Sequence, residues 1–206
     1  MSTAQFWEAR YAQSGQVWSG RVNPTLADVA SAVAPGRALD LGCGEGGDAI
    51  WLAQRGWLVT AVDISTTALA RGREAAMALP AASGRIDWVA ADLTEWRPTA
   101  SYDLVSACFL QSPVELPRTE ILRRAASAVA PGGSVLIISH AAPPPWAPPG
   151  HPHPAFAGPA EEVAELGLDS SEWELVLAEV REREARGPDG QTAMLSDSVV
   201  RARRAR

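Results

Sequence analysis

Glycines and carboxylates are concentrated in one short stretch, ALDLGCGEGGDA over residues 38–49, which leads from an apolar strand through a bend into a helix. Because glycine lacks a Cβ, Gly42, Gly44 and Gly46 can take positive φ and let the backbone approach a ligand closely. Asp63 ends the next predicted strand, where a carboxylate can accept hydrogen bonds from ribose hydroxyls. This arrangement of glycines and acid indicates a site for a nucleotide-type cofactor.

The motif by itself leaves the kind of cofactor open. The same letters satisfy the pattern G-x-G-x-x-G through Gly42, Gly44 and Gly47, which is typical of nicotinamide-dependent oxidoreductases. Nicotinamide and adenosyl cofactors both carry the ribose that Asp63 would hold, so Asp63 supports either one. The elements around the motif have to decide between them.

Strands and helices alternate along most of the chain. Helices are predicted over residues 5–13, 24–33, 65–79, 119–129 and 159–166, and strands over 38–41, 57–62, 86–91, 104–108 and 134–139. Asn23 and Ser65 are the predicted N-caps of the second and third of these helices. This alternation predicts a parallel sheet with helices on both faces and with ligands at the carboxyl ends of the strands. Residues 173–183 and 192–203, joined by a Gly- and Pro-containing turn, predict a terminal β-hairpin.

Five motifs occur in a family-specific order and spacing: ALDLGCGEGGDA (38–49), VTAVDIS (59–65), WVAADL (88–93), YDLVSACFLQSP (102–113) and APGGSVLIISH (130–140). Over about residues 35–140 the chain resembles class I S-adenosylmethionine-dependent methyltransferases. Its front segment, Phe6 to Leu26, is similar to the small-molecule group that includes tellurite-resistance and thiopurine methyltransferases. The resemblance implies an α/β, Rossmann-like class I methyltransferase fold. Its seven-stranded, mostly parallel sheet would carry an antiparallel C-terminal hairpin and helices on both faces.

The same resemblance implies a methyltransferase domain over residues 35–206, preceded by an N-terminal helical lid segment over residues 1–34. It implies S-adenosyl-L-methionine as the cofactor, because an antiparallel C-terminal hairpin fits this fold better than a nicotinamide domain. Asp40 would contact the amino group of the cofactor, Asp63 the ribose, and Asp92 the adenine. The expected cofactor-binding residues are Trp7, Tyr11, Trp18, Arg21, Asp40, Gly42, Cys43, Gly44, Gly46, Asp48, Asp63, Ile64, Asp92, Leu93 and Cys108.

Structural explanations compete with several of these roles. Asp40 can cap the glycine bend, Asp63 can cap the next helix, and Trp7 can be ordinary core. Cys108 is better explained as a small packed residue than as a nucleophile, because no histidine that would activate it is evident in the sequence. An apolar strand running into three glycines, by contrast, has little purpose except close backbone approach.

Two residues are expected to act on the methyl acceptor. His140 ends the last parallel strand, where it is placed for proton transfer, although a lone strand-end histidine is more often structural. Arg183 lies in the hairpin, where it would face an anionic acceptor or pair with Glu182 or Glu184.

The favoured reaction is methyl transfer to a small molecule, with a thiol or other chalcogen nucleophile as acceptor, since soft nucleophiles need little deprotonation. One alternative is an O- or N-methyltransferase of secondary metabolism that uses His140 as its base. A nicotinamide-dependent oxidoreductase and a cofactor-binding regulatory module without turnover are the alternatives from other classes.

Composition limits the remaining classes of function. The chain has 206 residues and a net charge of −6, and all 18 basic residues are arginine, which excludes a lysine Schiff base or a phosphate-loop lysine. The acidic balance argues against a nucleic-acid partner. The sequence also predicts no metal site from His151 and His153, no membrane span and no signal peptide. We therefore expect a cytoplasmic monomer or homodimer that acts on a small-molecule substrate.

Overall fold

The computed structural model describes residues 2–147, 156–187 and 189–206. Seven strands form one sheet in the order β3-β2-β1-β4-β5-β7-β6. They are β1 (Arg37–Leu41), β2 (Leu58–Asp63), β3 (Ile86–Ala90), β4 (Tyr102–Cys108), β5 (Val129–His140), β6 (Trp173–Arg186) and β7 (Thr192–Arg204). Strands β1 to β5 pair in parallel, and β7 lies antiparallel between β5 and β6. The predicted mostly parallel sheet with an antiparallel C-terminal hairpin is confirmed.

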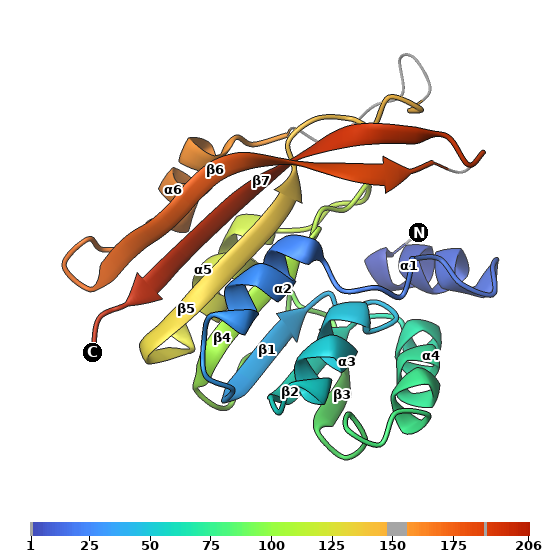
Figure 1. Ribbon diagram of the computed structural model, residues 1–206, viewed down its shortest axis with the longest axis horizontal. Helices are drawn as coiled ribbons and strands as arrows, with labels where there is room; N and C mark the ends of the chain where they lie inside the picture. The colour runs from blue at the N-terminus through green and yellow to red at the C-terminus, as the bar shows by residue number, and fades with distance from the viewer. Residues whose placement is uncertain (1, 148–155, 188) are drawn as a thin grey trace.

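Helices of the described ranges lie on both faces of this sheet, and α1 lies to the side, next to α4 (Figure 1). The helices are α1 (Thr3–Ala12), α2 (Pro24–Ser31), α3 (Gly47–Gln54), α4 (Thr66–Met77), α5 (Arg118–Ser127) and α6 (Pro159–Leu166). One buried apolar cluster contains Ile121 of α5 and Leu166 of α6, whereas a second contains Leu26 of α2 and Leu52 of α3. Each face therefore has its own core, and the carboxyl ends of the parallel strands remain the shared edge between them.

Local capping explains where two of the helices that border this edge begin. The Asn23 side chain accepts hydrogen bonds from the first turn of α2, and Pro24 occupies the first helical position. The Ser65 hydroxyl accepts from the Ala68 N–H at the start of α4. Both caps were predicted from the sequence, and Ser65, not Asp63, is the cap of α4.

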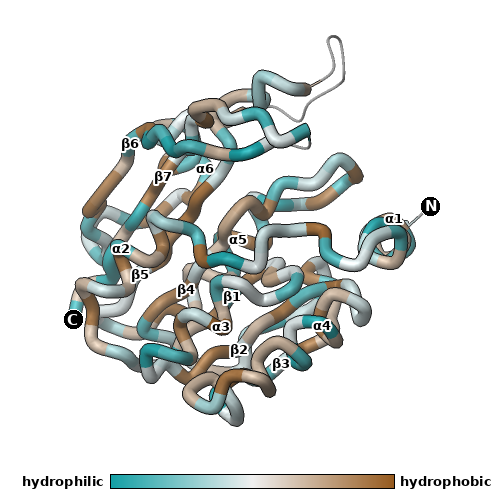
Figure 2. The backbone as a smooth tube through the Cα atoms, turned by 45° about the vertical axis from the view of Figure 1, so that its right-hand side comes forward, coloured by the Kyte–Doolittle hydropathy of each residue, from teal (hydrophilic) through white to brown (hydrophobic). Residues whose placement is uncertain are grey.

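The β6–β7 hairpin forms one side of the molecule (Figure 1). Val199 and Val200 of β7 are fully buried, because β7 is an interior strand and β6 is the edge of the sheet. In Figure 2 the central strands are largely apolar, whereas much of α1 is hydrophilic. Residues 148–155, which include His151 and His153, lie outside the described residues. Among the helices in the described ranges, none is long and apolar enough to cross a membrane.

Candidate active site

The glycine bend leads from the carboxyl end of β1 into α3 and lies beside the carboxyl end of β2. Gly42, Gly44 and Gly46 have φ values of 66°, 53° and 79°, in the left-handed region that favours glycine. The Gly42 N–H donates to the carbonyl oxygen of Val62 at 2.9 Å. The Gly44 N–H donates to Oδ2 of Asp63 at 2.8 Å. The bend is therefore held directly against the end of β2.

The protein's own side chains also use the space above these glycines. A Cβ on Gly42 would lie 2.7 Å from Cδ1 of Leu110, and one on Gly44 would lie 2.8 Å from the Tyr11 hydroxyl. A Cβ on Gly46 would overlap the ring of Trp88. The expectation that these glycines serve only backbone approach to a ligand is therefore incomplete, because each one also admits a neighbouring side chain.

Three carboxylates converge at this edge of the sheet. Asp40 is 2% exposed, and its Oδ1 accepts a hydrogen bond from the Ser106 hydroxyl at 3.3 Å. Oδ2 of Asp40 is buried and has no hydrogen-bond partner. Oδ1 of Asp48, in the first turn of α3, accepts from the Asn23 N–H at 2.6 Å. Asp63 is buried and accepts from the N–H groups of Ser65 and Gly44, at 2.9 Å and 2.8 Å.

Burial dominates the electrostatics of this group. Desolvation raises the pKa of Asp40 well above its usual range, and the neighbouring Asp48 raises it further. Desolvation also raises the pKa values of Asp48 and Asp63. The thiols of Cys43 and Cys108 have strongly raised pKa values for the same reason, with further increases from nearby carboxylates. Neither thiol is therefore a ready nucleophile.

Oδ2 of Asp40, which has no hydrogen-bond partner among the described residues, bears on whether an adenosyl cofactor fits this edge. A buried acceptor without a donor is costly, so this oxygen favours a ligand that brings an N–H group, such as the ammonium group of an amino acid. Asp63 lies beside it with two backbone donors already bound, and each of its oxygens has a second lone pair for a ribose hydroxyl. The edge therefore fits the amino acid and ribose parts of S-adenosylmethionine.

The front segment is fastened to the glycine bend by Glu45, a residue that the sequence reasoning did not single out. Glu45 is buried and accepts from the backbone N–H groups of Val17 and Trp18, the latter at 3.0 Å. Nη1 of Arg71, on α4, forms an ion pair with Glu45 at 2.9 Å. The other terminal nitrogen, Nη2, donates to the carbonyl oxygen of Tyr11 at 2.9 Å. The signal for this contact in the sequence was the presence of an acidic residue, Glu45, among the glycines of the bend.

Helix α1 lies beside α4 (Figure 1), and Glu8 joins the two helices. Its carboxylate accepts from the hydroxyls of Ser65, at 2.8 Å, and of Thr67. The hydrogen bond from the Thr67 side chain is the main reason that the pKa of Glu8 is lowered. Charge at Glu8 thus favours the docked position of α1 at the amino end of α4.

The expected lid residues differ in exposure. Tyr11 is buried, its hydroxyl accepts from Nε1 of Trp18 at 2.8 Å, and burial raises its pKa. Trp18 is 48% exposed, Trp7 is half-buried with its ring 6.3 Å from that of Tyr11, and Arg21 is exposed. Tyr11 and Trp18 lie against Gly44, so these two are in direct contact with the bend.

The residues expected near adenine follow the ends of β2 and β3. Oδ1 of Asp92 accepts from the Thr94 N–H at 2.9 Å, which makes a local turn, and the half-buried carboxylate remains accessible. Ile64 is half-buried directly after Asp63. Leu93 is buried in the core beneath α5, so packing accounts for its position.

A second constellation lies where β4 and β5 end, beside the hairpin. His140 pairs with Asp197 in the register of β5 and β7, and its Nδ1 lies 3.4 Å from Oδ1 of Asp197. Nε of Arg183 donates to Oδ2 of Asp197 at 2.5 Å. The ring of Phe109 stacks on His140 with centroids 4.3 Å apart, and Arg183 lies over the same Phe109 ring at 5.2 Å.

We call His140, Asp197, Arg183 and Phe109 the acceptor corner. The structure brings together the two residues expected to act on the acceptor, His140 and Arg183, and joins them through the buried Asp197. Arg183 pairs with Asp197 and not with Glu182 or Glu184, which the sequence had offered as partners. Phe109 has a φ of 56° and is the single non-glycine residue of the described chain with positive φ, an unusual conformation of the kind found at functional sites.

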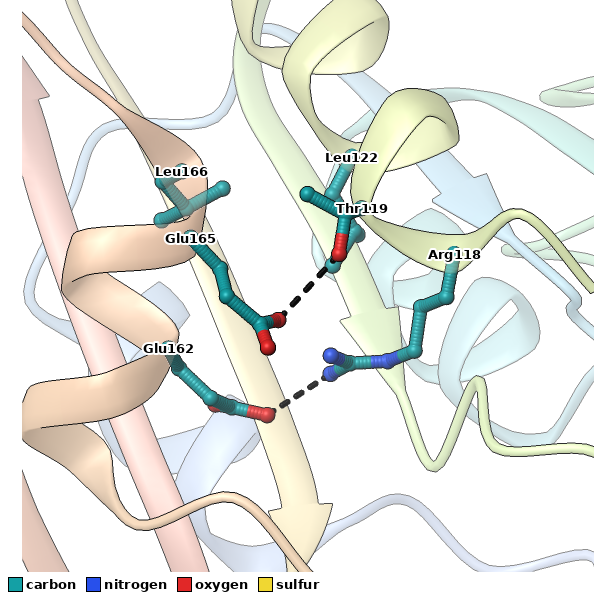
Figure 3. A pocket seen from close by; sticks show the side chains of 6 residues that line it. All are labelled: Arg118, Thr119, Leu122, Glu162, Glu165 and Leu166. Atoms are coloured by element: carbon teal, nitrogen blue, oxygen red, sulfur yellow. Dashed lines mark hydrogen bonds and ion pairs between the residues drawn. The ribbon is translucent and has the colours of Figure 1, made fainter. Parts of the chain in front are cut away.

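A buried polar network supports this corner from the opposite face of the sheet. Glu162 of α6 accepts from Arg118 at 2.8 Å, from Ser139 at 2.6 Å and from Ser198 at 3.3 Å. Ser139 precedes His140 and Ser198 follows Asp197, so the network fixes the two strand ends that carry the pair. Figure 3 shows its outer side as a pocket between α5 and α6 that is lined by Arg118, Thr119, Leu122, Glu162, Glu165 and Leu166.

Metal-ligating side chains do not cluster in residues 2–147, 156–187 and 189–206. Within those ranges, no three His, Cys, Asp or Glu side chains gather in a group that could hold a metal ion.

Comparison with known proteins finds a family match over the first part of the sheet. A family model described as a methyltransferase domain matches residues 38–133. Thiocyanate methyltransferase 1 of Arabidopsis thaliana is 34% identical over 102 residues, which cover 48% of this chain and 44% of that protein. The chain spans between 16% and 63% of the length of the first curated relatives that it matches.

Solved structures share the whole fold. One of them is described as the conversion of a disulfide bond into a thioacetal group during echinomycin biosynthesis. It is 23% identical in sequence and has a TM-score of 0.75, and the match covers 98% of this chain and 93% of that chain. The N-methyltransferase NodS from Bradyrhizobium japonicum WM9, in complex with S-adenosyl-L-homocysteine, has a TM-score of 0.69 at 16% identity, with both chains fully covered. Residues 38–133 thus match a methyltransferase domain, and the chain as a whole has the Rossmann-like fold of class I methyltransferases.

Proposed function

We propose that this chain transfers the methyl group of S-adenosylmethionine to a small-molecule sulfur or other chalcogen nucleophile. The cofactor, when bound, supplies an activated methyl group on a sulfonium. The chain's own task is then to hold cofactor and acceptor in line and to exclude water. Two resemblances support a sulfur acceptor: the partial match to a thiocyanate methyltransferase and the fold shared with the disulfide-to-thioacetal structure.

The environment of Asp40 is the observation that supports the cofactor assignment. Its unpartnered, buried Oδ2 offers a site for the cofactor ammonium, and Asp63 offers two oxygens to the ribose. Asp92, Ile64 and the Tyr11–Trp18 pair complete the proposed cofactor contacts. We further propose that residues 1–34 form a lid, with Glu45 as its anchor on the bend.

The choice of acceptor rests on what the site supplies to a nucleophile. The chain has no lysine, and the pKa values of Cys43 and Cys108 are raised, so neither a lysine nor a thiolate is prepared for a covalent intermediate. Asp197 lies closer to Arg183, at 2.5 Å, than to His140, at 3.4 Å. The proposed acceptor is therefore itself a good nucleophile at neutral pH and needs little help from a base.

Methyl transfer from labelled S-adenosylmethionine to a matched panel tests the proposal. The panel contains thiocyanate, a small thiol and selenite, together with a phenol and a small amine. We expect labelled product from the sulfur and selenium acceptors, and Asp40→Asn serves as the control that lacks the cofactor contact. Product from the phenol or the amine alone would contradict the chalcogen assignment.

His140 supports a second candidate, an O- or N-methyltransferase in which this residue takes the acceptor proton. The contact between His140 and Asp197 favours it, because a carboxylate orients the imidazole of many catalytic bases. His140→Gln would then lower transfer to the phenol or amine by roughly 10²-fold or more and flatten its pH profile. Cytoplasmic location, a monomeric or dimeric state and the lack of a nucleic-acid partner stay predictions of the sequence.

A further inference from the structure

Strand β6 is the outer edge of the sheet, opposite the edge formed by β3. Among the described residues it pairs with β7 on one side and with no strand on the other. Figure 1 shows it along one side of the molecule. An edge strand presents N–H and C=O groups that can form a ladder with another strand, and proteins commonly keep such edges short. At 14 residues β6 is long, so it offers an extended surface for strand pairing.

Apolar side chains are exposed along this edge. Val180 is 53% exposed, and Leu175 and Val176 on the same strand are exposed as well. Lysine and proline, which commonly protect an edge from pairing, do not occur in β6. Exposed apolar side chains that gather on one element favour association with a partner, because association removes them from water.

The charges next to Val180 indicate what that partner is. Glu179 and Arg181 flank Val180 and point to the same face of the sheet, where Nε of Arg181 donates to Oε1 of Glu179 at 2.5 Å. A second copy of β6 can lie antiparallel to the first with Val180 opposite Val180. Glu179 of each copy is then opposite Arg181 of the other, and four charges of alternating sign surround a twofold axis. Opposite charges in such positions stabilise a pair of strands.

Other positions of the axis are unfavourable. With the axis at Glu179, the two copies of this glutamate would lie opposite each other, and with the axis at Arg181 the two arginines would do so. Like charges directly opposite each other destabilise a strand pair. The charge pattern of β6 is therefore complementary to itself in the register centred on Val180, and a second copy of this chain supplies that complement.

We propose that the chain forms a homodimer through antiparallel pairing of two β6 strands about a twofold axis at Val180. The two sheets then become one continuous sheet. Arg183 of the acceptor corner lies opposite Leu177 of the second copy in this register, so the interface borders that corner. The inference goes beyond the proposed function and depends on neither the cofactor nor the acceptor.

Analytical ultracentrifugation of the full chain over roughly 1 μM to 1 mM measures the dissociation constant of the dimer. Glu179→Arg and Arg181→Glu each turn both opposite-charge pairs across the axis into like-charge pairs. Each variant alone should therefore dimerise roughly 10- to 100-fold more weakly than the wild type.

Mixing the two variants tests the register directly. In a heterodimer of the Glu179→Arg and Arg181→Glu chains, both pairs across the axis again have opposite charges. The equimolar mixture should therefore dimerise about as tightly as the wild type. Arg181 also lies 3.9 Å from Asp28 of α2, and its substitution affects that contact within the chain. Recovery on mixing cannot come from such a contact, because each chain in the mixture keeps its own substitution.

Glu182→Arg is the matched control. It makes the same change of charge on the same strand, but residue 182 points to the other face and lies opposite Ala178 of the second copy. The control should leave the dissociation constant unchanged.

Each outcome decides the proposal. A wild-type chain that is monomeric over the whole concentration range would overturn it, even if a variant does not fold. A dimer that neither charge variant weakens would overturn the assignment of the interface to β6. Weakened variants that do not recover on mixing would overturn the register centred on Val180.

Discussion

Asp40, next to the glycine bend, and Asp197, in the acceptor corner, are buried to the same extent, but only Asp197 has an arginine as its partner. Asp40 and Asp197 are both 2% exposed. Asp40 receives one hydroxyl and has no arginine partner, whereas Oδ2 of Asp197 receives Arg183 at 2.5 Å. Each carboxylate has a second oxygen without a hydrogen bond within the described residues, and that of Asp197 lies 3.4 Å from Nδ1 of His140. The difference separates a carboxylate that we propose for the ammonium group of the cofactor from one that an arginine already binds.

This contrast also concerns stability. An unbalanced buried carboxylate makes the free protein less stable, and such groups are found where a ligand later supplies the missing partner. A carboxylate paired with arginine keeps its neighbours in place, and loss of either partner leaves a buried charge alone. The same chemical change should therefore have opposite effects on stability at the two sites.

Asp40→Asn is expected to have the largest effect on binding. Loss of a charged hydrogen bond of about 1.5–3 kcal/mol should weaken cofactor binding by roughly 10- to 100-fold, as measured by calorimetry. The melting temperature of the free protein should rise at the same time. A fall in melting temperature at pH 8 would contradict the contrast.

The rise in melting temperature expected for Asp40→Asn should depend on pH in a definite direction. Burial raises the pKa of Asp40 in the folded protein, so the folded state binds its proton more tightly than the unfolded chain does. Stability from this group is complete below the pKa of the unfolded chain and is lost as the pH rises toward the higher folded-state value. Asparagine does not titrate, so its advantage should be larger at pH 8 than at pH 5.

Asp197→Asn should act in the opposite direction. It keeps the shape of the side chain but leaves Arg183 without its counter-charge, and we expect a loss of about 1–3 kcal/mol. At roughly 2–4 °C per kcal/mol this is a clear fall in melting temperature. Methyl transfer should fall while the dissociation constant of the cofactor is unchanged. A higher melting temperature would mean that the two carboxylates are equivalent.

Asp63→Ala should moderately lower both the melting temperature and the affinity for the cofactor. It removes the acceptor for the N–H groups of Gly44 and Ser65 as well as the proposed ribose contact. Each lost hydrogen bond is worth about 0.5–1.5 kcal/mol, so melting temperature and cofactor affinity should both decrease. Unchanged affinity with a lower melting temperature would restrict Asp63 to holding the bend.

Glu45→Gln should have the smallest effect, and its effect should be local. The substitution keeps an acceptor for the N–H groups of Val17 and Trp18 but removes the ion pair with Arg71. Hydrogen exchange over residues 5–21 should become faster in the free protein and remain slow with S-adenosylhomocysteine bound, because lids belong to the less stable parts of a structure. Equal protection with and without ligand in the wild type would identify the segment as core.

The sequence by itself determined the order of elements and the cofactor edge. Hydrophobic periodicity, the caps Asn23 and Ser65, and the glycines of the bend act through neighbours in the chain, so local patterns predicted them. Asp63 was predicted from its place at the end of the strand that follows the glycines, and the resemblance implied the role of Asp40. The resemblance added the cofactor and the family.

Only the tertiary structure decided which residues face one another across the hairpin. Asp197 meets His140 because of the antiparallel register of β5 and β7, and a slip of one residue would place a serine there and turn Asp197 to the other face. Glu45 anchors the front segment because the bend's positive φ values set its direction. Such contacts join segments far apart in the chain, and packing of the whole sheet, not local preference, fixes them.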